Sequence, residues 1–512
     1  MIAKAIGVFL LPVFLIMFTA HLKNQAPRPA VIDPAAVDQF ITRQMAAQRI
    51  PGMALAITQG DQVLYVQGYG KAGNGQPVTP RTQFLIASVS KSFTALAVMQ
   101  LVEAGKVDLD APVQHYLPEF TTADPAAASL ITIRHLLNQT SGLSENGYAD
   151  LQQPHPRTIA ERVTSLRAAR PVAQPGTEYH YFNPNYGTLA RVVEVVSGQP
   201  FSEYLETRIF EPLDMQHTVS AVTFQEGKHK AGSLAEGHLV AFGAAFPYSE
   251  IDGYLGGSGG VISTAEDMAH YLIVQNNAGQ YGDQQLAEPE SFAWMHTPPA
   301  GIQSSYAMGW IQNSLNGRRI IEHNGVLSVY SADVALLPEE EIGIALLYNV
   351  SSLPTNAIAQ PQIRAGLIAL LTGQQPKTGW MNVRHWGEFM ALLTLAGGLL
   401  AGRSLLSLPR WSQKAQAAPL WKLLPGIFWA FVPALMLVWG IPAMTARFGD
   451  RVFGFVNLYK SMLGIFTWLA LTGVMGVING TARIGILLRR FARTSPEQHM
   501  TFGKSKHQTG AR

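Results

Sequence analysis

The sequence predicts an α+β fold, in which an antiparallel sheet is flanked by helices, followed by three transmembrane helices. Strand-like segments lie at both ends of the region between about Asp33 and Gly373, and helical patterns lie between them. The last third of the chain carries three apolar runs in succession. Charged residues make up 14% of the chain, against roughly 25% in an average soluble protein. Membrane segments account for this deficit.

The start of the mixed region predicts a helix and a hairpin. Ala35–Arg49 has the pattern of a first helix. Met53–Thr58 and Val63–Gln67 alternate in polarity around a short Gly-containing turn, which indicates two paired strands. Apolar residues then recur at helical spacing after Ser88, so a helix is expected there.

The rest of the region continues the mixed pattern. Helical spacing covers Gly187–Val196 and Phe201–Phe210. Three consecutive strands and a closing helix are then expected at Arg319–His323, Ser328–Leu337, Ile342–Val350 and Ala357–Leu371. Together these segments predict one globular domain over residues 33–373.

An apolar segment at the N-terminus indicates export. Lys4 precedes the apolar stretch Ala5–Ala20, which is the layout of a secretory signal. Phe18 and Pro27 spoil the available cleavage sites, so residues 1–25 are predicted to be either a signal peptide or an N-terminal anchor. Both alternatives place the residues that follow outside the cytoplasmic membrane.

The three apolar runs predict a transmembrane domain over residues 386–480. Trp386–Leu408, Leu423–Met444 and Leu458–Ile478 each approach the ~20 residues that cross a bilayer. Basic residues without acids fill the first connection, and residues 481–512 form a basic tail. By the positive-inside rule both are cytoplasmic. The globular domain is therefore expected on the periplasmic or extracellular side of the inner (plasma) membrane, with the lipid bilayer as a partner.

Composition excludes several classes of function. A net charge of +3 is too small to indicate a nucleic-acid partner. The chain has no cysteine, which excludes a thiol nucleophile and a disulfide framework. The sequence contains no HExxH motif or Cys/His cluster, so no metal or other cofactor is predicted. It gives no indication of the oligomeric state.

Ser88-Val89-Ser90-Lys91 is the first motif with chemical meaning. Three residues apart on a helix, Ser88 and Lys91 share one face. A serine hydroxyl needs a base beside it to act as a nucleophile, and a lysine serves as that base only when its pKa is depressed. Ser88 is the candidate nucleophile and Lys91 the candidate base. Taken alone, the motif fits a helix-capping serine and a solvated lysine better.

Tyr181-Phe182-Asn183 is the second motif, on a loop or at a helix entrance. Tyr181 is able to carry a proton if a nearby ammonium group stabilises its phenolate. Asn183 offers both a donor and an acceptor to a substrate amide. Taken alone, the motif fits a half-buried tyrosine and a helix-capping asparagine.

His323-Asn324-Gly325 is the third motif, at the end of a predicted strand. A glycine on an edge strand lets the backbone approach a ligand closely. The N–H of Val326 would then complete an oxyanion hole with the N–H of Ser88. His323, Gly325 and Val326 are therefore candidates for substrate binding. His385-Trp386-Gly387 has the same pattern, at the mouth of a predicted membrane span.

In this order the three motifs resemble the penicillin-recognising serine hydrolases, and most closely their class C β-lactamase-like branch. Further stretches are similar to that branch: Leu136–Leu143, with Gln139 where histidine is usual, Pro212–Met215, Gly259–Met268 and Met308–Trp310. The resemblance covers about Asp33 to Leu371. It implies a β-lactamase/transpeptidase-like fold, a helical subdomain over the sheet and a covalent acyl-enzyme on Ser88.

Two other motifs are weighed and rejected. Lys377-Thr378-Gly379 spells the lysine form of the third motif, but it follows the closing helix and has no strand to carry it. Gly256–Gly260 satisfies the nucleophile-elbow pattern around Ser258, yet no strand precedes it and the next helix opens only later. Ser258 is expected to be a loop residue.

The resemblance implies hydrolysis of a small molecule or peptide through an acyl-enzyme. His323, in place of lysine or arginine, weakens a fixed cation for a substrate carboxylate. The expected function is a peptidase or amidase acting on peptides that contain D-amino acids or carry an N-acyl group, because the layout resembles membrane-bound prodrug-maturing D-peptidases. The alternatives are an esterase, a penicillin-binding carboxypeptidase or β-lactamase, and a sensor that stays acylated.

Overall fold

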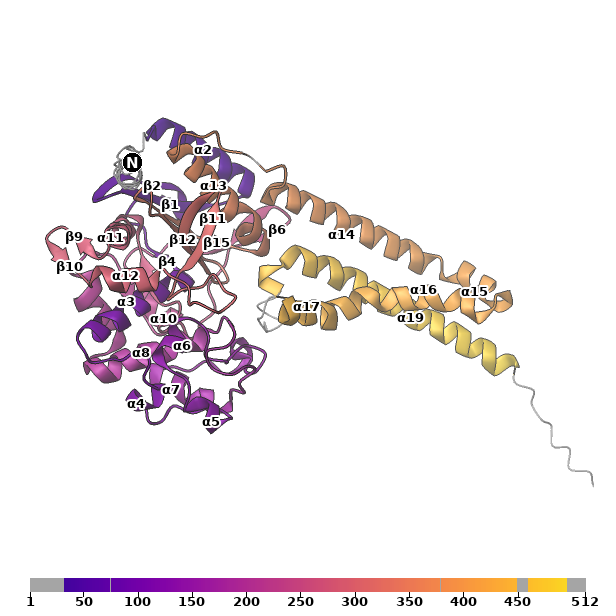
Figure 1. Ribbon diagram of the computed structural model, residues 1–512. Coiled ribbons are helices and arrows are strands. Elements are labelled where there is room, and N and C mark those ends of the chain that lie inside the picture. Colours follow the sequence, from indigo (N-terminus) through magenta and orange to yellow (C-terminus); the bar gives the residue numbers. More distant parts are fainter. Residues whose placement is uncertain (1–31, 74, 378, 449–458, 495–512) are drawn as a thin grey trace, which may run out of the picture. The chain divides into compact units, whose positions relative to one another are not determined.

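The structure is a computed structural model that describes residues 32–494 except 74, 378 and 449–458 (Figure 1). The predicted signal or anchor, residues 1–25, lies outside the described residues, as does the tail beyond Thr494. The chain divides into two compact units, described here one at a time. The first comprises Met1–Phe389 and Pro442–Leu463, and the second Met390–Ile441 and Gly464–Arg512.

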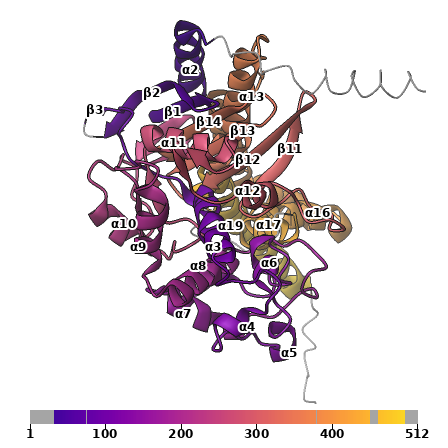
Figure 2. The ribbon, with the colours of Figure 1, turned by 60° about the vertical axis from the view of Figure 1, so that its left-hand side comes forward.

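A seven-stranded antiparallel sheet forms the centre of the first unit (Figure 2). Its strand order is β11-β12-β13-β14-β1-β2-β3. The strands are β1 (Gly52–Gln59), β2 (Gln62–Gly73), β3 (Gln76–Pro77), β11 (Ile311–Leu315), β12 (Arg318–Val326), β13 (Ser331–Leu337) and β14 (Ile342–Tyr348). The N-terminal hairpin thus pairs with a strand from the end of the region, as the α+β prediction requires.

Both faces of this sheet are covered by helices. α2 (Pro34–Gln48) and α13 (Gln360–Leu371) pack on one face, where they enclose the Met53, Leu55 and Ile57 side chains of β1. The alternate residues of β1, Ala54 and Ala56, point to the other face and join the larger core. A strand alternates its side chains between two faces, so β1 is apolar throughout because both faces are buried.

α11 and the helical subdomain lie on the second face. α11 (Ala265–Asn276) packs against β1, β2, β13 and β14. The subdomain carries the nucleophile region at its border with the sheet (Figure 1). Its helices are α3 (Ser90–Glu103), α4 (Val113–Tyr116), α5 (Pro125–Ala128), α6 (Ile133–Leu137), α7 (Ile159–Ser165), α8 (Asn183–Ser197) and α9 (Phe201–Leu205).

Shorter elements complete the first unit. They are β4 (Phe84–Leu85), β5 (Val219–Ser220), α10 (Phe224–Lys230), β6 (His238–Ala241), β7 (Ala244–Pro247), β8 (Val261–Ser263), β9 (Gln280–Tyr281), β10 (Gln284–Gln285), α12 (Pro289–Met295) and β15 (Val350–Ser351). Two of the small sheets matter for the site and its surroundings. β8 lies between β4 and β5, and β6 lies between β15 and β7.

Two predicted strand boundaries beside the third motif are wrong. β12 does not end at His323 but continues to Val326, so the whole third motif lies within the strand. β13 begins at Ser331 rather than Ser328, because residues 327–330 form the turn that reverses the chain. Both shifts follow from the pairing of Val326 with Ser331, which the polarity pattern of a fully buried strand does not reveal.

The C-terminal third contains three helices long and apolar enough to cross a membrane: Val383–Leu406, Leu420–Thr445 and Leu463–Ala492. The first is α14 and the third belongs to α19 (Leu463–Thr494). The second joins α16 (Leu420–Leu435) to α17 (Ile441–Phe448) through a π-helical turn. The connection that precedes it contains a further helix, α15 (Leu408–Ala417).

The third helix extends beyond its predicted span. The sequence predicts a span that ends at Ile478 and a tail from residue 481, and α19 continues to Thr494. Within the second unit Arg483 donates to the carbonyl oxygen of Gly426 and to the hydroxyl of Ser404, which also accepts from Asn479. A charge with partners on neighbouring helices does not have to end a helix in an apolar surrounding.

Candidate active site

Ser88 lies in a 3-10 turn, Ala87–Val89, that leads directly into α3. From Thr82 to Met99 every residue is buried except Ser88. Ala87, the residue before it, has φ = +50°, in the left-handed region that side chains other than glycine rarely adopt. Such strain persists only where the surroundings enforce it, and it is common at active sites. The turn thus presents one hydroxyl at the surface of a rigid core.

Lys91 contacts Ser88 from the first turn of α3. Its Nζ donates to Ser88 Oγ at 3.1 Å and to the main-chain carbonyl oxygen of Ser258 at 2.7 Å. The side chain is fully buried. Its Nζ lies 5.0 Å from the centre of the Tyr181 ring and 5.8 Å from that of Tyr186. The predicted base is therefore in hydrogen-bond contact with the predicted nucleophile, inside an aromatic pocket.

The carbonyl of Ser258 is held in place by a glycine-rich turn. Gly257 has φ = +72°, and a Cβ there would stand 2.3 Å from the Tyr186 carbonyl oxygen. Thr94 of α3 donates to the Gly257 carbonyl oxygen at 2.6 Å. Ser258 is a turn residue, as predicted, and the rejected nucleophile elbow instead supplies a main-chain acceptor to Lys91.

A second glycine turn supports α3 from another side. Gly309, in Met308-Gly309-Trp310, has φ = +82°. A Cβ on it would stand 2.9 Å from both the Lys91 carbonyl oxygen and Ser92 Cα. Any side chain at this position would therefore displace the helix that carries the lysine.

Tyr181 and Asn183 lie where a loop enters α8, as predicted. Gln139 holds this loop: its Oε1 accepts from the main-chain N–H of Phe182 at 3.1 Å and from Asn185 Nδ2 at 2.7 Å. The Gln139 carbonyl oxygen accepts from the N–H of His180 at 2.9 Å. Gln139 is fully buried and has φ = +59°. The residue that departs from the usual histidine is thus the anchor of the second motif.

An aromatic cluster brings the second and third motifs together. The ring centre of Tyr306 lies 5.9 Å from Tyr181 and 5.9 Å from His323, and those two rings are 6.4 Å apart. Among the described residues, none donates a hydrogen bond to the buried Oδ1 of Asn183. A buried acceptor without a donor is unusual, which makes Asn183 Oδ1 a candidate partner for a substrate N–H.

The third motif occupies the end of β12. β11 pairs with β12 only as far as Glu322, so the outer edge of β12 from His323 to Val326 is not covered by β11. His323 is buried, with Nδ1 2.7 Å from the Asn324 carbonyl oxygen. Gly325 is where the strand approaches the nucleophile turn, since a Cβ would stand 2.1 Å from the Ile86 carbonyl oxygen. Val326, the proposed oxyanion donor, is half-exposed at the end of the strand.

Arg364 anchors this strand from behind. Its guanidinium bridges Glu322 on β12, at 3.1 Å, and Asp333 on β13, at 2.7 Å. Burial raises the pKa of Asp333 to about 6, and the Arg364 guanidinium opposes that rise. A carboxylate in this position depends on its cation, so the ion pair fixes α13 to the strands that end at the site.

Sequence reasoning missed four contributors: the Ser258 carbonyl, Gln139, Tyr186 and Tyr306. Three of them lie in or beside stretches that carried the resemblance. The sequence therefore marked these positions but did not indicate what each residue does. Gln139 belongs to Leu136–Leu143, Ser258 precedes Gly259–Met268, and Tyr306 precedes Met308–Trp310. Lys377 and Gly379, from the rejected third-motif match, lie outside any strand between α13 and α14.

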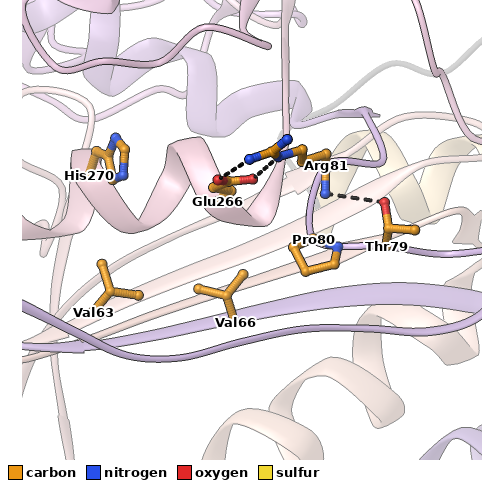
Figure 3. A pocket seen from close by; sticks show the side chains of 7 residues that line it. All are labelled: Val63, Val66, Thr79, Pro80, Arg81, Glu266 and His270. Carbon is orange, nitrogen blue, oxygen red and sulfur yellow. Dashed lines mark hydrogen bonds and ion pairs between the residues drawn. The ribbon is translucent and has the colours of Figure 1, made fainter.

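A groove of about 670 Å³ lies elsewhere, between β2 and α11 (Figure 3). Its lining residues are Val63, Val66, Thr79, Pro80, Arg81, Glu266 and His270. Arg81 and Glu266 pair across it at 2.6 Å, and the Arg81 guanidinium lowers the pKa of Glu266. None of the candidate catalytic or binding residues lines this groove, and we assign no chemistry to it.

The beta-lactamase family model matches residues 37–367, which is most of the first unit and includes all three motifs. The chain belongs to the beta-lactamase family. It is accordingly a serine hydrolase related to β-lactamases and penicillin-binding proteins, with the fold described above. The roles of individual site residues remain predictions supported by their geometry.

Two curated relatives illustrate the similarity. "Protein flp" of Staphylococcus aureus is 27% identical over 321 residues, which are 62% of this chain and 63% of that protein. The "Beta-lactamase" of Escherichia coli is 28% identical over 349 residues, which are 61% of this chain and 88% of that protein. The chain thus spans less than two thirds of the staphylococcal protein.

Solved structures show the same fold. The octameric penicillin-binding protein homologue from Pyrococcus abyssi superposes with a TM-score of 0.57 and 29% identity, over 67% of this chain and 78% of that one. A penicillin-binding protein from Bacillus halodurans gives a TM-score of 0.53 at 24% identity, over 65% of this chain and 98% of that one.

Proposed function

We propose that this protein is a membrane-anchored amidase or peptidase with its hydrolase domain outside the cytoplasmic membrane. Its substrates are peptides that contain D-amino acids or carry an N-acyl group, and the reaction passes through an acyl-enzyme on Ser88. The observation that carries the proposal is the buried Lys91, in hydrogen-bond contact with Ser88 at 3.1 Å and with the Ser258 carbonyl at 2.7 Å.

Acylation begins with proton transfer from Ser88 Oγ to Lys91 Nζ as the oxygen attacks the substrate carbonyl. The N–H groups of Ser88 and Val326 stabilise the oxyanion that forms. Tyr181, whose ring lies 5.0 Å from Lys91 Nζ, passes a proton to the leaving amine. The C–N bond breaks, and the acyl group stays on Ser88.

Deacylation reverses the proton transfers with water as the nucleophile. Water attacks the ester carbonyl, and Tyr181, acting together with Lys91, accepts its proton. Lys91 returns a proton to Ser88 Oγ as that oxygen leaves. The acid product is released and the serine is regenerated. Neither half-reaction requires a cofactor in this scheme.

Two features support an amide substrate. The uncovered edge of β12 from His323 to Val326 offers main-chain groups to an extended peptide. The Asn183 Oδ1 acceptor matches an amide N–H, which an ester lacks. His323, in place of a lysine or arginine, supports a substrate that does not depend on a free carboxylate at that point.

The experiment follows the mass of the detergent-purified full chain during exposure to N-acyl-D-amino-acid amides, short esters and a penicillin. Wild type is compared with Ser88→Ala and with the matched control Ser165→Ala, which removes a serine hydroxyl from α7. We expect amide turnover in wild type and Ser165→Ala and none in Ser88→Ala. Amide turnover that persists in Ser88→Ala would overturn the assignment of the nucleophile.

The other outcomes separate the alternatives. Turnover of esters but not amides would replace the proposal with an esterase. A persistent penicillin adduct on Ser88 without amide turnover would instead identify a penicillin-binding enzyme or an acylation sensor, since slow deacylation distinguishes that class.

A further inference from the structure

The hairpin of β6 and β7 ends in an unusual two-residue turn. Ala241 pairs with Ala244, and Phe242 and Gly243 between them have φ = +49° and +74°. A two-residue turn with both central residues at positive φ is typical of asparagine, aspartate or glycine. Phe242 therefore occupies a position that its backbone disfavours.

The ring of Phe242 is only partly covered within the chain. A left-handed conformation costs a residue with a Cβ roughly 1–2 kcal/mol, and Phe242 remains 36% exposed. A partly exposed aromatic residue on a strained turn is a candidate for a contact outside the chain. Tyr248, just after β7, is exposed as well.

The turn lies against the first turns of α14. A Cβ on Gly387 would stand 2.0 Å from Gly243 N and 2.5 Å from the carbonyl carbon of Phe242. A Cβ on Gly243 would lie 3.4 Å from the Arg384 carbonyl oxygen. All of these residues belong to the first unit. The hairpin tip and the start of α14 are therefore in main-chain contact.

The sequence of α14 indicates that this contact lies near the membrane interface. Arg384 and Glu388 form an exposed ion pair at 2.8 Å in its first turns, and the helix has no charged residue from Phe389 to Gly402. With a rise of about 1.5 Å per residue, Gly387 lies within one turn of the apolar run. Trp380, which precedes the helix, is 82% exposed. Exposed aromatic rings at such a boundary are typical of the membrane interface.

We propose that the β6–β7 hairpin docks the hydrolase domain onto the membrane, with Phe242 inserted into the interfacial region of the leaflet that α14 enters. The inference rests on the membrane anchoring proposed above and adds a second point of attachment. The partner is lipid, because the hairpin tip contacts the first turns of a helix whose sequence has no charged residue from Phe389 to Gly402.

The hairpin also connects the membrane to the site. The chain continues from β7 to Glu250, which is buried and whose carboxylate accepts from the N–H of Val329 at 3.0 Å. Val329 lies in the turn that follows Val326. The hairpin is therefore linked to the turn after β12 by a short stretch of chain and one hydrogen bond.

The test uses the absence of cysteine from the chain. Phe242→Cys, Leu392→Cys and Leu130→Cys are each made in the full-length protein, labelled with a nitroxide and reconstituted into phosphatidylcholine–phosphatidylglycerol nanodiscs. Leu392 lies in α14, and Leu130 is an exposed apolar residue of the helical subdomain. We expect the label at 242 to be relaxed more by oxygen than by a water-soluble nickel complex, as at 392, and the label at 130 to show the reverse.

Each outcome decides a different question. A water-like label at 242 beside a lipid-like label at 392 would overturn the docking proposal and leave the membrane anchor intact. A water-like label at 392 would overturn the anchor itself, while Ser88-dependent hydrolysis is assayed separately. A label at 242 shielded from both reagents would indicate a protein contact, such as a second copy, and would also overturn lipid docking.

A second pair of variants tests the role of the Phe242 ring without relying on a substitution that destabilises the fold. Phe242→Asn suits the left-handed turn, so its thermal unfolding in detergent should match or exceed that of wild type. A nitroxide at the exposed neighbour Ala244→Cys reports the height of the hairpin with and without this change. We expect its oxygen relaxation to fall in Phe242→Asn. An unchanged value would show that the ring does not hold the hairpin at the membrane.

Discussion

Gly325 lies so close to Ile86 that a Cβ on the glycine would stand 2.1 Å from the Ile86 carbonyl oxygen and 3.0 Å from the Cβ of Ala87. β12 and the nucleophile turn are thus in main-chain contact. The position of Ser88 relative to the N–H of Val326 depends on this contact.

Gly325→Ala is expected to separate the strand from the nucleophile turn. Loss of one oxyanion donor lowers turnover about 10²–10³-fold, so kcat should fall by that factor. The steric conflict should also lower the free energy of unfolding by about 1–3 kcal/mol. Steady-state amide hydrolysis and thermal unfolding measure the two effects. Gly232→Ala is the control, because a Cβ on Gly232 has nothing within 4 Å and Gly232, like Gly325, does not have a positive φ. Equal losses in the two variants would contradict the proposed contact.

Lys91→Met should preserve the fold and remove the base. The methionine side chain fills a similar apolar volume, while general-base catalysis of about 10²–10⁴-fold is lost. Lys91→Arg is the sharper variant, since a guanidinium stays protonated and cannot accept the Ser88 proton. The measurement is the rate of acyl-enzyme formation in a single turnover. Acylation by Lys91→Arg at the wild-type rate would exclude Lys91 as the base.

Gln139→Ala should loosen the loop that carries Tyr181. It leaves the N–H of Phe182 and the amide of Asn185 without their acceptor, at a cost of about 1–3 kcal/mol for each buried group. We expect a lower unfolding temperature and a reduced kcat. Gln139→His retains an acceptor and should retain more activity than Gln139→Ala. Gln67→Ala, at an exposed glutamine of β2, is the control and should leave both quantities unchanged.

Acid should destabilise the first unit through His296. Packing of the half-buried His296 against Trp310 desolvates its ring and lowers its pKa to about 3, whereas the unfolded chain binds a proton near pH 6.5. The stability that this neutral ring contributes is complete above pH 6.5 and is lost as the pH falls toward 3. The loss is at most about 1.4 kcal/mol per pH unit. Denaturant unfolding of wild type and His296→Gln across this range should show a shallower slope in the variant, and parallel slopes would refute the assignment.

The architecture and the contact between Ser88 and Lys91 could be predicted because both depend on local signals. The sheet was predicted from strand-like segments such as Met53–Thr58, and the Ser88–Lys91 contact from helical spacing. The end of β12 was placed too early because its pairing with β13, and not its polarity pattern, determines where the strand ends. The continuation of the last helix beyond the predicted span was not foreseen, because Arg483 finds its partners on other helices.

The contributors that were missed act through the main chain or through long-range contacts. The Ser258 carbonyl reaches Lys91 across 167 residues of sequence, and no residue type signals a carbonyl acceptor. Gln139 was noted for its difference from histidine, but its partners lie in a loop more than 40 residues later. Such contacts follow from the tertiary fold and not from spacing.

Gly309 and Gly325 meet the nucleophile region through the close approach of one backbone to another, and Gly257 meets it through its carbonyl oxygen, which accepts from Thr94 of α3. These contacts are made by main-chain atoms of the three glycines. Substitution of other side chains around Ser88 therefore leaves them in place. The family's machinery in this chain is separable from its substrate preference, and directed evolution should change the second far more readily than the first.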